Sequence, residues 1–127
     1  MSYSRPHARK KGLPRIVSAF RNSCNGFVAV WEEPAFRQEV LLAAVLVPAA
    51  CFVGRSWLEV CVLIGMVVFV LVTEILNSAV EAVVDRVGPE WHALSKSAKD
   101  MGSAAVLLAL CLCGLTWAWA LYERFLA

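Results

Sequence analysis

The residues best suited to chemistry form a polar stripe within a long apolar stretch, Glu74, Asn77, Glu81 and Asp85. Separations of three, four and four residues keep them on one face of a helix, which turns about 100° per residue. A carboxylate inside a membrane costs about 3 kcal/mol, so such a stripe must face water, a ligand or another polar helix. Carboxylates without histidine or cysteine suit Mg²⁺, which one or two carboxylates commonly hold together with phosphate oxygens.

A second polar group follows the next loop. Lys96, Lys99 and Ser103 recur at spacings of three and four residues, with Asp100 beside them. A lysine at a membrane boundary can hold phosphate, and it can equally extend to lipid head groups. Acidic groups together with cations are the components of phosphoryl transfer. The sequence has no glycine-rich phosphate loop of the Walker or protein-kinase kind, so kinase chemistry would require another scaffold.

The elements that must position these groups are apolar helices. Of 127 residues, 60% are hydrophobic and 17% are charged, which indicates one small domain with lipid as its solvent. We expect an all-α membrane protein with three spans at about 35–54, 57–87 and 98–122. Ser97 is expected to cap the third span.

Basic residues indicate the orientation. Counted by alternate sides of the membrane, ten Lys and Arg residues lie on one side and two on the other, which places the N-terminus in the cytoplasm. We expect a basic extension at 1–14, better suited to anionic lipids than to nucleic acid. An amphipathic helix at 15–33 is expected to lie on the membrane surface, and a soluble cap packed on the bundle is the alternative. The five cysteines fit no zinc pattern.

Two segments carry a resemblance to a known family. The sequences EILNSAVEAVVD at 74–85 and HALSKSAKDMGSAA at 92–105 make the chain similar to the small prokaryotic diacylglycerol kinases, and FRQE at 36–39 extends the match. The resemblance implies a homotrimer in the bacterial inner membrane, with a periplasmic C-terminus and active sites shared between subunits. It also implies transfer of the γ-phosphoryl group of ATP to 1,2-diacylglycerol, with Mg²⁺, to give phosphatidic acid in phospholipid recycling.

The resemblance also implies roles for individual residues. Glu74 would accept the proton of the lipid hydroxyl and Asn77 would orient that carboxylate, while Glu33 and Glu81 would hold Mg²⁺. The implied nucleotide-binding set is Arg15, Asn22, Glu33, Glu81, Glu90, Trp91, His92, Lys99 and Asp100. The implied lipid-binding set is Arg37, Gln38, Glu39, Glu74 and Ser103.

The chain departs from the family pattern in its first helix. Asn22, Ser23 and Cys24 stand where the best-known members have an aromatic pair, and the stretch around Glu33 is one residue shorter. The contacts expected from that helix are therefore less secure than those from 74–85. The resemblance assigns no role to Asp85.

Three other functions compete with this interpretation. Undecaprenol kinases share the acidic stripe and the Ala-Lys-Asp motif, although 36–39 and 101–105 favour the diacylglycerol branch. A small cation or proton transporter would carry its acids near the middle of the membrane, whereas Glu81 and Asp85 are expected near its cytoplasmic boundary. A purely structural subunit would not explain why the acidic residues lie on one face of the helix.

Overall fold

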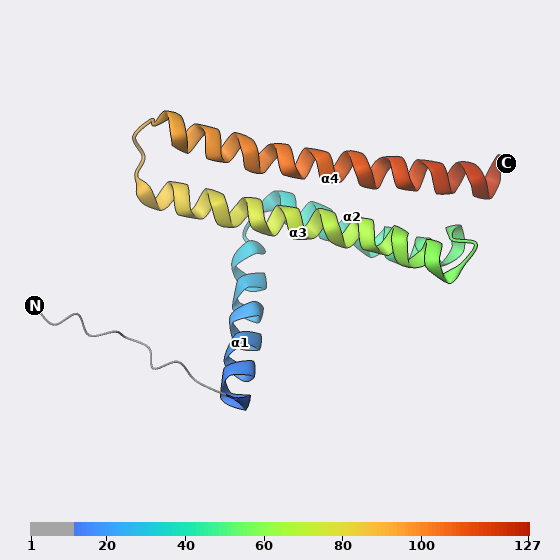
Figure 1. The fold of residues 1–127 in the computed structure, drawn as a ribbon, viewed down its shortest axis with the longest axis horizontal. Coiled ribbons are helices and arrows are strands. Elements are labelled where there is room, and N and C mark those ends of the chain that lie inside the picture. Colours follow the sequence, from blue (N-terminus) through green and yellow to red (C-terminus); the bar gives the residue numbers. More distant parts are fainter. Residues whose placement is uncertain (1–11) are drawn as a thin grey trace, which may run out of the picture. The chain divides into compact units, whose positions relative to one another are not determined.

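The computed structural model describes residues 12–127, and all regular structure within them is helical. The helices are α1 (Leu13–Val30), α2 (Pro34–Val53), α3 (Trp57–Val87) and α4 (Ala93–Phe125) (Figure 1). Within the described residues, α2, α3 and α4 are long and apolar enough to cross a membrane. The prediction of an all-α chain with three such helices is therefore confirmed. Most of the predicted extension at 1–14 lies outside the described residues.

The chain divides into two compact units, and α1 belongs to the first. This helix begins after Gly12, whose φ of 73° favours glycine. It ends at Val30 rather than at the expected 33. The cause lies in Pro34, because the residue before a proline is disfavoured in helical geometry and Glu33 is accordingly extended, with φ −76° and ψ 121°.

The second unit begins at Glu33 and contains the three apolar helices. Ser56 caps α3 by accepting a hydrogen bond from the Glu59 backbone N–H at 3.2 Å. The start of α4 differs from the prediction, because the helix begins at Ala93 and His92 Nδ1 accepts from the Leu94 N–H at 3.2 Å. Ser97 lies inside the helix and does not cap it. No glycine or proline interrupts 90–101, so the polar first turns continue the helix.

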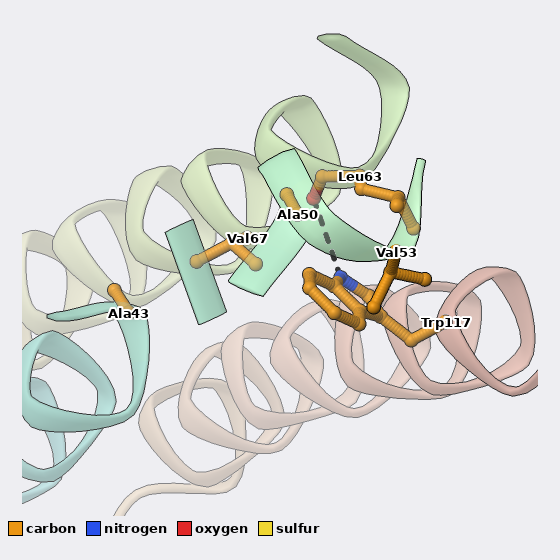
Figure 2. Packing of buried hydrophobic residues seen from close by; sticks show 6 residues of the cluster. All are labelled: Ala43, Ala50, Val53, Leu63, Val67 and Trp117. Carbon is orange, nitrogen blue, oxygen red and sulfur yellow. Dashed lines mark hydrogen bonds between the residues drawn. The ribbon is translucent and has the colours of Figure 1, made fainter. Parts of the chain in front are cut away.

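Helix α3 packs antiparallel to both α2 and α4 (Figure 1). Their common core consists of Ala43, Ala50, Val53, Leu63, Val67 and Trp117 (Figure 2). Alanines on α2 let the helices approach closely. The indole Nε1–H of Trp117 donates to the Leu63 carbonyl at 3.3 Å, which ties α4 to α3.

The loop between α2 and α3 is also held to α4. Arg55 donates a hydrogen bond to Glu123 at 2.5 Å and a longer one to Glu59 at 3.4 Å. These bonds, the one to Glu123 first, raise the pKa of Arg55 above its usual value. This end of the unit is thus fastened by packing and charge, and the polar stripe lies towards the other end of α3.

Candidate functional site

Glu74 is the buried charged side chain of the described residues, with 6% of its surface exposed. The charges of Glu33 and Glu81 act on it, and the charge of Glu74 acts on Glu39 in turn. Glu33 immediately precedes α2 and Glu39 lies in its first turns, whereas Glu74 and Glu81 belong to α3. The packing of α2 on α3 therefore gathers carboxylates that are distant in sequence around one buried carboxylate.

The amide of Asn77 is held between α3 and α4. Its Nδ2 donates to Glu81 Oε1 at 3.3 Å, while its Oδ1 is buried without a hydrogen-bond partner. Gly102 of α4 lies directly against this amide, and a Cβ added there would collide with Oδ1. The reversed amide would set two acceptors, Oδ1 and the Glu81 carboxylate, against each other. The Asn77 amide is therefore held in one orientation, with Nδ2 towards Glu81 and Oδ1 covered by Gly102.

A cleft of about 400 Å³ lies where the loop joins α3 to α4. Its lining residues are Val84, Asp85, Gly88, Pro89, Glu90, Trp91, His92, Ser95, Lys96, Lys99 and Asp100. Five members of the predicted nucleotide set, Glu90, Trp91, His92, Lys99 and Asp100, are therefore brought together in one place.

Two ion pairs shape this cleft. Lys99 Nζ lies 2.6 Å from Asp85 Oδ1, which joins α4 to α3. Lys96 Nζ lies 2.5 Å from Asp100 Oδ2, one turn further along the same helix. The charge of Lys99 also interacts with Glu81. Lys99 thus connects the cleft to the carboxylates around Glu74.

The predicted lipid residues lie on α2 and α4. Arg37 and Gln38 are exposed in the first turn of α2, and Ser103 is exposed on α4. Glu39 has a buried Oε2 without a hydrogen-bond partner, beside a pocket of about 40 Å³ whose other lining residues are apolar. Arg15 and Asn22 belong to α1 in the first unit, whereas the site residues above belong to the second.

Sequence reasoning missed two positioning features. Asp85 received no role, because its partner Lys99 is 14 residues away across a loop. Gly102 also received none, since its contact with Asn77 depends on how closely α4 approaches α3. The run of small residues in MGSAA at 101–105 was the sequence signal for this contact, because small residues favour close helix packing.

The arrangement combines a buried carboxylate, an oriented amide and a cleft containing two lysines. Within residues 12–127, no group of three or more His, Cys, Asp or Glu side chains is placed to hold a metal ion. Negative groups beside phosphate-binding cations suit transfer of a phosphoryl group to an alcohol.

Comparison with known proteins agrees with this chemistry. A family model described as Prokaryotic diacylglycerol kinase matches residues 21–121. The diacylglycerol kinase of Pseudomonas aeruginosa (strain PAO1) is 48% identical over 114 residues, which cover 89% of this chain and 93% of the relative. The diacylglycerol kinase of Escherichia coli (strain K12) is 46% identical over 115 residues, covering 90% and 94%. That of Haemophilus influenzae is 43% identical over 112 residues, covering 87% and 95%. The chain belongs to the prokaryotic diacylglycerol kinase family.

Proposed function

We propose that this protein transfers the γ-phosphoryl group of MgATP to the free hydroxyl of 1,2-diacylglycerol, giving phosphatidic acid and ADP. One observation carries the proposal: α3 holds the buried Glu74 and the Asn77–Glu81 pair, and the charge of Glu81 acts on Lys99, which lines the cleft together with Lys96. The names of the relatives support the lipid substrate, since the diacylglycerol kinases compared above align over nearly the whole chain.

In the proposed reaction, Glu74 accepts the proton of the lipid hydroxyl. The hydroxyl oxygen forms a bond to the γ-phosphorus as the bond from the β,γ-bridging oxygen breaks, and ADP leaves with that electron pair. The burial of Glu74 limits the access of water, which would compete with the lipid as acceptor. Arg37, Gln38, Glu39 and Ser103 are proposed to contact the lipid.

The cleft is proposed to hold the nucleotide through Glu90, Trp91, His92, Lys99 and Asp100. Asp85 positions Lys99 by its ion pair at 2.6 Å. Arg15 and Asn22 of α1 are proposed to complete the nucleotide contacts.

Glu33 and Glu81 are the residues that we propose to hold a magnesium ion. Both supply oxygen donors, and the action of both charges on Glu74 supports this choice. In proteins Mg²⁺ is commonly held by one or two carboxylates together with phosphate oxygens and water, which the two glutamates would allow here. When bound, the ion neutralises charge that develops on the phosphoryl oxygens.

The proposed setting is the bacterial inner membrane, with the N-terminus in the cytoplasm and the C-terminus in the periplasm. The excess of Lys and Arg near the N-terminus and the second loop supports this orientation. Helix α1 exposes apolar side chains, including Ile16, Phe20 and Phe27, which suit a place on the membrane surface. Helix α4 exposes Leu107, Leu108 and Leu115, an apolar surface that lipid or other subunits of a homotrimer with shared sites would cover.

The test is phosphate transfer from γ-labelled MgATP in mixed micelles containing either dioleoylglycerol or undecaprenol. We expect labelled phosphatidic acid, no labelled undecaprenyl phosphate, and loss of activity with EDTA that added Mg²⁺ restores. Labelling of undecaprenol alone would retain the phosphoryl chemistry and refute the lipid assignment. Labelling of neither lipid by well-folded protein would refute the proposal.

A further inference from the structure

Lys96 and Lys99 both line the cleft, and of these two Lys99 is the one whose ion pair joins two helices. Lys99 joins α4 to α3 through Asp85, and its charge also acts on Glu81. Among residues 12–127, Lys96 pairs within its own helix, with Asp100, and the two side chains are 61% and 64% exposed. The pair of Lys96 therefore connects no two elements of the fold.

Helix stability does not explain Lys96 either. In pairs four residues apart, the favourable order places the acid before the base, whereas here the lysine comes first. Lys96 also lies near the first turn of α4, which begins at Ala93. The helix dipole disfavours a positive charge at that end. The cation is thus placed where the helix gains little from it.

The charged side chains that line the cleft favour a ligand-binding role for Lys96. Three carboxylates, Asp85, Glu90 and Asp100, line the same space as the two ammonium groups. A negatively charged nucleotide entering this cleft needs a cation that can leave its carboxylate. Lys96 meets that need, because Asp100 is exposed and stays solvated when the pair opens.

We propose that Lys96 is a further nucleotide-binding residue, which exchanges Asp100 for a phosphate oxygen of the bound nucleotide. Lys96 and Lys99 are three residues apart, or about 4.5 Å along the axis and about 60° around it. Both line the cleft, so one polyphosphate chain can contact both. This inference rests on the proposed kinase function and deepens it.

The experiment compares Lys96→Gln and Lys96→Arg with Arg86→Gln in the full-length protein in detergent. Arg86 is a matched control, since it is an exposed cation near the cleft but does not line it. Calorimetry gives the Kd of the non-hydrolysable nucleotide Mg·AMP-PCP, and mixed-micelle kinetics give kcat and the KM values for MgATP and dioleoylglycerol.

We expect Lys96→Gln to raise both the Kd and the KM for MgATP about tenfold, the size of one charge-assisted hydrogen bond. The kcat and the KM for dioleoylglycerol stay within about twofold, and Lys96→Arg and Arg86→Gln bind nearly as the unaltered protein does. An unchanged Kd for Lys96→Gln, in protein that phosphorylates dioleoylglycerol, overturns this inference alone. So does an effect confined to the dependence of activity on anionic phospholipid, which would assign Lys96 to lipid head groups. Unaltered protein that neither binds Mg·AMP-PCP nor transfers phosphate overturns the proposed function as well.

Discussion

Replacing Gly102 by alanine should damage the site while adding a single methyl group. The new Cβ would collide with Asn77 Oδ1, so either the amide turns away from Glu81 or α4 moves away from α3. Overpacking of this kind costs about 1–3 kcal/mol. Alanine returns about 1 kcal/mol of helix propensity, so we expect a net loss of about 0–2 kcal/mol. Activity should fall further, because misplacing a reacting group by about 1 Å can cost about 100-fold in rate.

Gly114→Ala provides the control. Gly114 lies in the same helix, and a Cβ there meets nothing within 4 Å. This variant should keep its kcat and gain up to about 1 kcal/mol from helix propensity. The assays are mixed-micelle diacylglycerol kinase activity and thermal unfolding in the same detergent.

A double variant separates the clash from other effects. Asn77→Ala removes the side chain that the new Cβ would strike, so adding Gly102→Ala to it should cost little or no further stability. If Gly102→Ala behaves like Gly114→Ala in both assays, the close approach of α4 to Asn77 is not what fixes the amide, and the reasoning fails.

Three further predictions concern the charges and the core. Asp85→Asn removes the charge that holds Lys99, so the KM for MgATP should rise about three- to tenfold, with the KM for dioleoylglycerol unchanged; equal changes in both constants would contradict this. Trp117→Phe loses the hydrogen bond to the Leu63 carbonyl, so thermal unfolding should show a loss of about 1 kcal/mol with unchanged kcat. Leu63→Ala opens a cavity in the common core and should cost about 2–5 kcal/mol; a loss below that of Trp117→Phe would argue against the packing shown in Figure 2.

The long apolar helices were predictable because hydropathy and length determine them directly. The sequence marks both ends of the helix from Trp57 to Val87, because Ser56 precedes it and Gly88 follows it. The spacing of Glu74, Asn77 and Glu81 likewise follows from helix geometry alone. Their shared face and its polar character were therefore evident before any contact was known.

Contacts between helices were not predictable in the same way. The pairing of Asp85 with Lys99 depends on the path of a loop, and the approach of Gly102 to Asn77 depends on interhelical distance. The start of α4 at Ala93 was also missed, because the polar first turns lack the hydropathy that marks a span. The roles of the site residues came from family resemblance, and they stay predictions until they are tested by substitution.

The role of Glu74 is best tested by a single-turnover measurement on Glu74→Gln. Purified variant and unaltered protein are mixed with γ-labelled MgATP and dioleoylglycerol, and labelled phosphatidic acid is followed by rapid quench. Glu59→Gln, near the other end of α3, is the control for losing one carboxylate from that helix. We expect Glu74→Gln to bind Mg·AMP-PCP and unfold as the unaltered protein does, with the transfer rate reduced by about 100-fold or more. Transfer by Glu74→Gln at the rate of the unaltered protein would show that the hydroxyl proton goes elsewhere, and would remove Glu74 from the chemistry.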